Sequence, residues 1–445
     1  MSITLILIAL LAFYVACNLG ANDVANSMGT SVGSKAITLT QAIMIAGILE
    51  FTGAVLFGQE VSQTLATKIA NPILFAATPK VYVIGMVTVL ITCGLWLQIA
   101  TSRGLPVASS HAVVGAIAGF SWVAVGVDAI NWSSIGLITI GWIVTPIISS
   151  AIAALLYSQI KHWILDQPNQ IAQLQQWIPW LSVILFGIFG VIVLPSLTQP
   201  LTNYLNQEIG LNLPNYDIPL LTGAVAAIAL TVTSWRQLEE AGGQGAGGRG
   251  EMCSQSLYTE RLVLSEVEVS RSAIPSPVEP LFARFQLLSA CFVAFAHGSN
   301  DVGNAIAPLA AIIYINRTGS VPINDITIPI WILILGGVGI VTGLAIWGKN
   351  VITTIGENII PLQPSSGFCA ELATATTILL ASRLSLPVST SHALIGGVIG
   401  IGIVQNIKSI KFSTLQGIAL AWLITLPASA IFSAAIFSTS RILFL

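Results

Sequence analysis

Residues 20–26 read GANDVAN, a segment that places an acid and two amides inside a long apolar run. Residues 298–304 read GSNDVGN and interrupt a second apolar run in the same way. Most of the matched positions are polar or glycine, which are not interchangeable in apolar surroundings, so the match means more than a shared run of leucines would. The two segments indicate an internal repeat of the chain.

A second pair of matched segments follows. Residues 102–112 read SRGLPVASSHA, and residues 382–393 read SRLSLPVSTSHA. The histidine of the first block lies 111 − 22 = 89 positions after the first asparagine, and the histidine of the second block lies 392 − 300 = 92 positions after its asparagine. Both order and spacing are therefore preserved, which indicates that a whole block of sequence is repeated.

The composition is that of a membrane protein. Of the 445 residues, 55% are hydrophobic and 8% are charged, whereas soluble domains contain about 25% charged residues. Apolar stretches near the roughly 20 residues that cross the hydrocarbon recur along the chain. We therefore expect an all-α, multi-pass integral membrane protein in contact with the lipid bilayer. A net charge of −2 argues against a nucleic-acid partner and favours a small solute.

The chain divides into two membrane blocks and a linker. Residues 1–235 form the first block, and residues 281–445 form the second. Residues 236–280 are rich in glycine, then in charged residues and proline, which is typical of a flexible, solvent-exposed linker. Because arginines bias a loop towards the cytoplasm, we expect the linker on the cytoplasmic side.

A duplicated bundle with polar interruptions at matching positions is the pattern of a secondary transporter, whose substrate site lies near the midplane where the repeats meet. In the alternative, the repeat is a relic of gene duplication in a purely structural bundle. That alternative does not explain why an amide and an acid, which are costly in hydrocarbon, stand at both equivalent positions. The pattern favours alternating access around a midplane site.

The Ser-rich elements predict re-entrant helical hairpins. The apolar runs after His111 and His392 are short for a full crossing, and the preceding Leu-Pro ends a helix. Hydroxyl residues suit the cap of the helix that follows; in the plainer interpretation they do nothing else. Two helix N-termini with unpaired N–H groups would, however, also enclose a tetrahedral oxyanion. The predicted anion ligands are Ser109, Ser110, Thr390 and Ser391.

Four acids lie in apolar segments: Asp23, Asp301, Glu50 and Glu371. An intramembrane acid indicates function, because leaving it uncompensated costs about 2.5 to 3.5 kcal/mol. Hard cations take oxygen ligands, so the amide oxygens beside the aspartates favour a cation site. The two glutamates have isoleucines at their equivalent positions, and each could bind a cation, hold a proton or hydrogen-bond between helices. The predicted cation or coupling residues are Asp23, Asn26, Glu50, Asp301, Asn304 and Glu371.

Three histidines flank these elements. His111 and His392 directly follow the Ser-rich tips, an order that could suit Ser-His nucleophilic catalysis. Adjacent residues on a helix do not face each other, however, and no acid is spaced to orient either ring. We expect packing, or a hydrogen bond that supports the tip, and we interpret His297 in the same way.

The paired GANDVAN and GSNDVGN segments, together with LPVASSH and LPVSTSH, resemble the inorganic phosphate transporter (PiT) family. The resemblance covers both membrane blocks and leaves only the linker outside. It implies about 12 transmembrane segments in two inverted repeats, a homodimer, and symport of phosphate with Na⁺ or H⁺.

Carried over position by position, the resemblance implies which residues contact phosphate and which contact the cation. Glu50 and Glu371 match two acids that family members need for transport. The sequence departs from the family in its short linker and at Ser109-Ser110, where many relatives have Gly-Thr or Thr-Thr. The implied phosphate ligands are Asn22, Asp23, Ser109, Ser110, Asn300, Asp301, Thr390 and Ser391, with Na⁺ at Asp23 and Asp301.

We therefore expect a multi-pass protein of the cell (inner) membrane that imports inorganic phosphate with Na⁺ or H⁺ and has no cofactor. A sulfate or other oxyanion permease of the same fold is an alternative, because sulfate has the same shape but no protons at neutral pH. A membrane-embedded enzyme acting on phosphate esters is a remote alternative. It would need a nucleophile with a facing base or a catalytic metal, and neither is evident in the sequence.

Overall fold

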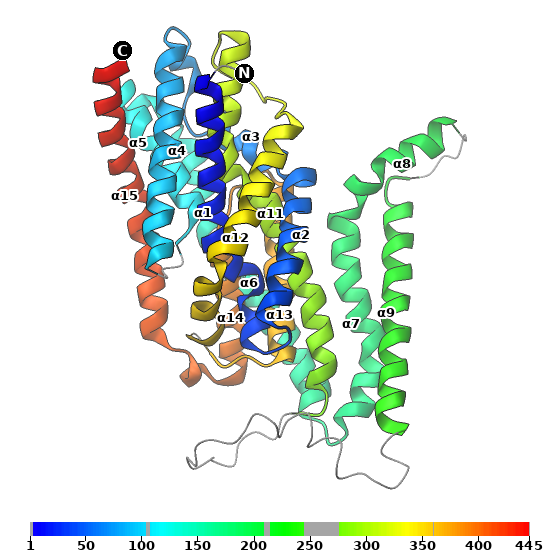
Figure 1. The fold of residues 1–445 in the computed structure, drawn as a ribbon. Helices are drawn as coiled ribbons and strands as arrows, with labels where there is room; N and C mark the ends of the chain where they lie inside the picture. Colours follow the sequence, from blue (N-terminus) through cyan, green and yellow to red (C-terminus); the bar gives the residue numbers. More distant parts are fainter. Residues whose placement is uncertain (1–2, 104–106, 209–213, 244–275, 359, 445) are drawn as a thin grey trace. The chain divides into compact units, whose positions relative to one another are not determined.

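The computed structural model describes residues 3–103, 107–208, 214–243, 276–358 and 360–444 (Figure 1). Nine helices of this described part are long and apolar enough to cross a membrane, so the prediction of an all-α, multi-pass membrane protein is confirmed. The count of about 12 segments stays a prediction. The helices are α1 (Ile3–Gly33), α2 (Leu39–Phe57), α3 (Gln59–Thr67), α4 (Pro79–Ser102), α5 (Ser109–Ala124), α6 (Trp132–Ile160), α7 (Gln170–Ile192), α8 (Leu194–Glu208), α9 (Asp217–Gly243), α11 (Glu279–Thr318), α12 (Ile330–Asn358), α13 (Pro364–Arg383), α14 (Thr390–Asn406) and α15 (Phe412–Phe444).

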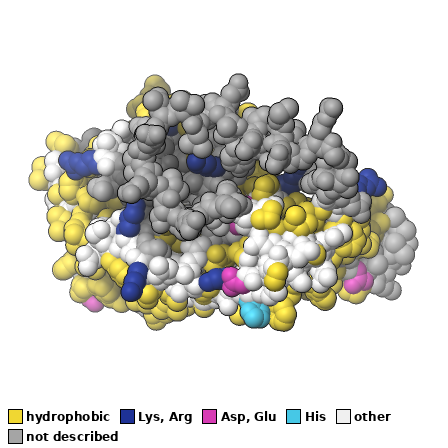
Figure 2. Space-filling model, turned by 90° about the horizontal axis from the view of Figure 1, so that it is seen from below, with side chains coloured by type: hydrophobic (Ala, Val, Ile, Leu, Met, Phe, Trp, Pro, Cys, Tyr) yellow, Lys and Arg dark blue, Asp and Glu magenta, His cyan; other side chains and the backbone are white. Residues whose placement is uncertain are grey.

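Large apolar side chains cover the outer faces of the long helices. Leu423 of α15 is 74% exposed and Ile48 of α2 is 69% exposed. Exposed apolar surface of this extent is stable against lipid and costly in water. Seen from below, the described surface carries Lys and Arg side chains on a polar background, with hydrophobic side chains around the rim (Figure 2). This distribution is the one expected where a helical bundle leaves the membrane.

The chain forms two compact units that differ from the two sequence blocks. One unit comprises Met1–Tyr157 together with Phe282–Leu445, and the other comprises Ser158–Leu281. The first unit therefore combines residues of both blocks, 1–235 and 281–445. Most of the predicted linker, residues 244–275, lies outside the described residues. Its first residues continue α9 to Gly243, because the sequence RQLEEA consists of good helix formers.

In the first unit, the same helix crossing occurs twice. Gly20 of α1 lies against the backbone of Ile340 in α12, and Gly298 of α11 lies against the backbone of Glu50 in α2. A Cβ atom at either glycine would overlap the facing carbonyl group, so only glycine allows the two backbones to approach this closely. The equivalent helices α1 and α11 run in opposite directions (Figure 1).

Each Ser-rich element connects two helices at a break. The helix α5 begins at Ser109 after α4, and α14 begins at Thr390 after α13. The prediction that these hydroxyl residues cap the helices is wrong: the N-cap positions are Ala108, which makes no side-chain cap, and Ser389, which accepts from the N–H of His392 at 3.3 Å. The hydroxyls lie in the first helical turn instead and are available for other contacts. The Leu-Pro break at residues 104–106 lies outside the described residues.

The short arms α5 and α14 pack on long helices of the opposite sequence block. On α5, Gly119 lies against the backbone of Ala430 in α15. On α14, Gly400 lies against the backbone of Ser150 in α6. Because each short helix is anchored to the other block, the N-termini of α5 and α14 are brought to the same region of the unit.

The second unit is a helical hairpin. Its helices α7 and α9 pack against each other along their length and are connected through α8 (Figure 1). The indole N–H of Trp235 on α9 donates to the carbonyl of Gln175 on α7 at 2.8 Å. This unit contains none of the residues predicted to bind an ion.

Candidate functional site

Asp23 is buried on α1, and both of its carboxylate oxygens accept hydrogen bonds. Ser109 donates its hydroxyl to Oδ2 at 2.8 Å. Asn26, one turn further along α1, donates its amide to Oδ1 at 3.3 Å. Asp23 is 1% exposed, so these side chains take the place of water in solvating its charge.

Asp301 on α11 has the same arrangement. Thr390, the first residue of α14, donates its hydroxyl to Oδ2 at 2.9 Å, and Asn304 donates to Oδ1 at 3.5 Å. Asp301 is also 1% exposed. The sequence repeat therefore corresponds to a repeated piece of chemistry, an aspartate held between a tip hydroxyl and an amide one turn away.

The two halves of this cluster are joined by their amides. Asn26 of α1 donates to the hydroxyl of Ser391 at 2.9 Å and to that of Thr390 at 3.3 Å. Asn304 of α11 donates to the hydroxyl of Ser109 at 3.2 Å. Each amide thus links its own aspartate to the hairpin tip that serves the other aspartate, and the tips of α5 and α14 share one site.

Several polar atoms of this site have no partner in the described part of the chain. They include the amide oxygens of Asn26 and Asn304 and the hydroxyl of Ser110, all buried. Buried polar atoms are nearly always hydrogen-bonded or bound to an ion or water. Two free amide oxygens beside two carboxylates suit a hard cation, and a free hydroxyl in the first turn of a helix suits an anion.

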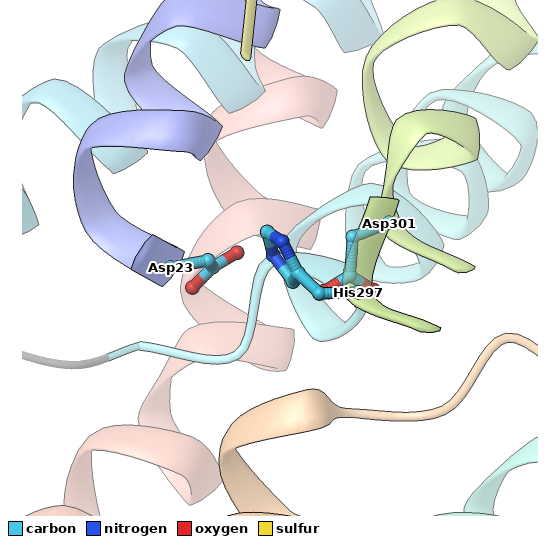
Figure 3. Close-up of side chains that lie close together, drawn as sticks. All are labelled: Asp23, His297 and Asp301. Atoms are coloured by element: carbon cyan, nitrogen blue, oxygen red, sulfur yellow. The ribbon is translucent and has the colours of Figure 1, made fainter. Parts of the chain in front are cut away.

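A histidine stands between the two aspartates (Figure 3). The distances between one carboxylate oxygen of Asp23, one ring nitrogen of His297 and one carboxylate oxygen of Asp301 are all within 4.8 Å. His297 contacts Asp301 Oδ2 through Nε2 at 3.1 Å and Glu50 Oε1 through Nδ1 at 3.1 Å. Both contacts are close polar contacts that become ion pairs when the imidazole is protonated. His297 and Glu50 are fully buried.

His297 was expected to serve packing or to support a tip, and its position between the acids is not evident from the sequence pattern used for that expectation. Two signals could have identified it. His297 precedes Asp301 by four residues, so both lie on one helix face. In addition, the position equivalent to His297 in the first block is Leu19, which marks the histidine as a departure from the repeat.

The predicted phosphate ligands Asn22 and Asn300 contact the segments that lead to the tips. Asn22 donates to the hydroxyl of Thr101 at 3.1 Å and accepts from the N–H of Val107 at 3.3 Å. Asn300 donates to the hydroxyl of Ser382 at 3.0 Å and to the carbonyl of Leu386 at 3.3 Å. These contacts hold the first hairpin against α1 and the second against α11.

Glu371 on α13 forms a second polar cluster with other residues. Its Oε1 accepts from the hydroxyls of Thr30 and Ser31 at 2.6 Å each and from the amide of Gln286 at 3.1 Å. Its Oε2 accepts from the hydroxyl of Ser289 at 2.8 Å. Glu371 is fully buried. Four neutral donors around one acid solvate a carboxylate, and their oxygens would also suit a small hard cation.

The second cluster has no counterpart in the other half of the repeat. Glu371 corresponds to Ile91, and the residues equivalent to its four donors are apolar as well: Ile8, Leu11, Pro308 and Leu309. An entire polar cluster therefore stands in one half where the other half has hydrophobic packing. A purely structural repeat would have no need of this difference.

His111 and His392 form a reciprocal contact at the base of the tips. The His111 ring stacks on Trp142 at 3.8 Å, and its Nδ1 lies 3.2 Å from the carbonyl of Trp422. The His392 ring stacks on Trp422 at 3.7 Å, and its Nδ1 lies 2.9 Å from the carbonyl of Trp142. Because a carbonyl only accepts, each Nδ1 carries the proton. The contacts are those of side chains that support the tips.

The predicted residues are thus distributed over two places. The tip hydroxyls, Asp23, Asp301, Asn26 and Asn304 meet in one cluster, and Glu50 is connected to it through His297. Glu371 lies in the second cluster. This arrangement can hold cations on carboxylate and amide oxygens and an oxyanion at two helix N-termini.

Comparisons with known proteins agree with this geometry. A sequence model of the phosphate transporter family matches residues 19–433. The chloroplastic inorganic phosphate transporter 2-1 of Arabidopsis thaliana is 38% identical over 423 residues, which cover 95% of this chain and 69% of the relative. A Haemophilus influenzae protein, whose name suggests a phosphate permease, is 36% identical over 436 residues, which cover 98% of this chain and 96% of that protein.

A solved structure has the same fold. It is described as the sodium-dependent phosphate transporter, and it superimposes with a TM-score of 0.78 at 33% identity over 99% of both chains. The match includes both membrane blocks, in agreement with the extent of the resemblance read from the motifs.

Proposed function

The chain belongs to the phosphate transporter family, and from that premise we propose that it is a secondary active transporter that imports inorganic phosphate by symport with Na⁺ or H⁺. Members of this family are transporters, which excludes the alternative of an enzyme acting on phosphate esters. The observation that carries the proposal is the doubled cluster of aspartate, amide and hydroxyl where the tips of α5 and α14 meet.

Phosphate binds between the two tips. The first turns of α5 and α14 offer N–H groups without helical partners, and the positive ends of both helix dipoles face the same region. The hydroxyls of the tips add hydrogen-bond donors. Such a site needs no lysine or arginine, which favours release as well as binding. The proposed ligands are Ser109, Ser110, Thr390 and Ser391, with Asn22, Asp23, Asn300 and Asp301 beside them.

The cation binds first. Asp23 and Asp301 place two carboxylates beside the tips, and their negative charge repels a phosphate anion. A Na⁺ ion held by a carboxylate and the free amide oxygen of Asn26 or Asn304 removes that repulsion. The requirement for a cation before the anion is what couples the two fluxes.

Glu371 supplies a second coupling site. Its carboxylate and the oxygens of Thr30, Ser31, Ser289 and Gln286 would accommodate a Na⁺ ion, and the carboxyl group would alternatively carry a transported proton. The cluster exists in one half of the repeat only. We therefore propose that this site carries the coupling ion separately from the phosphate site.

Alternating access follows from two inverted repeats that rock around the filled site. The opposite directions of α1 and α11 support the inverted arrangement (Figure 1). The packing of each short arm on the other block supports movement of a hairpin together with its long partner helix. A homodimer in the cell membrane, with the linker in the cytoplasm, completes the proposal.

The test is uptake of radiolabelled phosphate into proteoliposomes under an imposed Na⁺ gradient and, separately, under an imposed proton gradient. We expect one of the two gradients to drive accumulation, and excess unlabelled sulfate to leave it unchanged. Strong inhibition by sulfate would instead support the alternative of a sulfate or general oxyanion permease. No uptake of phosphate under either gradient would contradict the proposal.

A further inference from the structure

The two equivalent helix crossings, α1 with α12 and α11 with α2, differ in one pair of side chains. The matched segments align His297 with Leu19 and Glu50 with Ile340. The crossings themselves are equivalent, since Gly20 lies against the backbone of Ile340 and Gly298 lies against that of Glu50. The same position therefore holds a buried apolar pair in one half and a buried polar pair in the other.

The polar pair lies at ion-pair distance from Asp301, whereas Asp23 is the more distant neighbour of His297, within 4.8 Å. His297 Nε2 lies 3.1 Å from Asp301 Oδ2, which also accepts from Thr390. In the other half, Leu19 has no polar atom to offer Asp23. Asp301 therefore has a third partner at the position where Asp23 has a hydrocarbon side chain, and the two aspartates differ in their surroundings although their motifs match.

Glu50 is held by two partners in the described structure. Its Oε1 accepts from the hydroxyl of Ser27 at 2.8 Å and lies 3.1 Å from His297 Nδ1. Within the described residues, Glu50 forms its hydrogen bond and its ion-pair contact with Ser27 and His297 and not with either aspartate. The route from Glu50 to the site therefore runs through the imidazole ring. Ser27 is itself replaced by Ala305 at the equivalent position of the second block, so the support for Glu50 is as asymmetric as the pair.

We propose that Glu50 is a positioning residue that acts through His297: it fixes the imidazole against Asp301 and so sets how strongly the Asp301 half of the site binds the co-transported cation. The inference rests on the proposed function, because that function makes Asp301 a cation ligand. It assigns Glu50 a role different from a direct ligand of Na⁺ or a carrier of H⁺, which are the roles that an acid in the membrane suggests first.

The apolar pair of the equivalent crossing shows which substitutions can replace the polar pair Glu50 and His297. Removing one member of a buried ionic pair leaves the other without compensation, whereas replacing both by apolar residues of suitable shape is often tolerated. The pair Leu19 and Ile340 shows which apolar residues the equivalent crossing accommodates. The variants are Glu50→Ile, His297→Leu and their combination, with Ile340→Leu as a matched control in the apolar crossing.

Two measurements test the proposal. The first is gradient-driven phosphate uptake into proteoliposomes. The second is a titration of the purified protein with NaCl, in which the thermal unfolding midpoint rises and the half-saturating NaCl concentration is determined, with choline chloride as the ionic-strength control. We expect each single variant to lose uptake by about tenfold or more and the combination to recover a large part of it, since the two residues act as one unit. We expect the half-saturating NaCl concentration of the combination to differ from that of the unmodified protein by about fivefold or more, and that of Ile340→Leu to stay unchanged.

Two outcomes would overturn the proposal. A combination as inactive as Glu50→Ile alone would show that Glu50 contacts the ion itself. A combination that transports with unchanged Na⁺ dependence would show that the pair serves packing only. If the combination does not fold, the milder cycle of Glu50→Gln, His297→Gln and their combination replaces it, and strictly additive shifts in Na⁺ dependence would then reject the coupling.

The NaCl titration separates this inference from the proposed function. It requires no phosphate, so an unmodified protein that transports no phosphate but shows non-additive Na⁺ shifts in the cycle would refute phosphate symport and retain the role of Glu50. Phosphate uptake together with additive shifts would do the reverse.

Discussion

Ser109 and Ser110 are neighbours in the first turn of α5, and their hydroxyls have different surroundings. Ser109 donates to Asp23 and accepts from Asn304. The Ser110 hydroxyl is buried and has no partner in the described structure. A hydroxyl without a protein partner at a helix N-terminus is the one most available to a bound anion.

This difference leads to a prediction for two alanine variants. Ser109→Ala leaves Asp23 and Asn304 each short of a partner and should lower the free energy of unfolding by about 1 to 3 kcal/mol. Ser110→Ala removes no internal hydrogen bond, so it should leave the unfolding midpoint nearly unchanged and raise the KM for phosphate. Thermal unfolding and the concentration dependence of uptake check the pair. Equal effects of both variants on stability would contradict the assignment.

Glu371 leads to a prediction about coupling. In Glu371→Gln the four surrounding donors face a neutral side chain, so the cluster loses the charge that attracts a coupling ion. We expect gradient-driven accumulation of phosphate to be lost, while exchange of labelled for unlabelled phosphate across the membrane continues. Uptake and exchange measured in the same proteoliposomes check this. Accumulation at the rate of the unmodified protein would exclude Glu371 from coupling.

At the scale of helices, glycine determines where the long elements cross. Gly298 allows α11 to touch the backbone of α2, and Gly20 does the same for α1 and α12. The crossings bring the polar segments of α1 and α11 to the tips of α5 and α14. The helices are long because they span the membrane, but the glycines decide which of their turns meet.

A prediction follows for the crossing. In Gly298→Ala the added Cβ would overlap the Glu50 carbonyl, so the helices must separate, at a cost of about 1 to 3 kcal/mol typical of overpacking. Gly136→Ala on α6 is the matched control, because nothing lies within 4 Å of its added Cβ. We expect a lower unfolding midpoint and lower uptake for the first variant only. Similar midpoints for the two variants would argue against the close approach.

At the scale of the whole molecule, the proposed cation and anion sites share one cluster built from both sequence blocks. Two buried carboxylates lie beside the tips that we propose to bind the anion, so each ion should favour the binding of the other. Such reciprocity is a requirement of linked equilibria and not a feature of either site alone.

The corresponding prediction concerns stability. Phosphate with Na⁺ should raise the unfolding midpoint by more than the sum of the shifts from Na⁺ alone and from phosphate alone, since ligands that bind only the folded protein stabilise it by mass action. Sulfate with Na⁺ should not reproduce the excess. Thermal unfolding with choline chloride as the control checks this. A full shift with phosphate in the absence of Na⁺ would contradict cation-first binding.

The sequence by itself determined the class of the protein and the identity of most candidate residues. Hydropathy over roughly 20 residues reports a membrane helix because the bilayer imposes that length locally. The paired segments NDVAN and NDVGN, and SSHA and TSHA, identified Asp23, Asp301 and the tip hydroxyls as candidates because polar residues are rare in such helices. These are properties of a segment, and a segment displays them without its neighbours.

Only the tertiary structure decided which distant side chains meet. No local pattern indicates that Asn304 donates to Ser109, that α5 packs on α15 of the other block, or that His297 lies between Glu50 and Asp301. The cap prediction failed for a similar reason, since each helix begins at the first of the expected cap residues, Ser109 or Thr390, and the hydroxyl of that residue donates to an aspartate instead. These contacts depend on where helices far apart in sequence cross, and the crossings are set by close packing at single glycines such as Gly20 and Gly298, which have no side chain to reveal their partners.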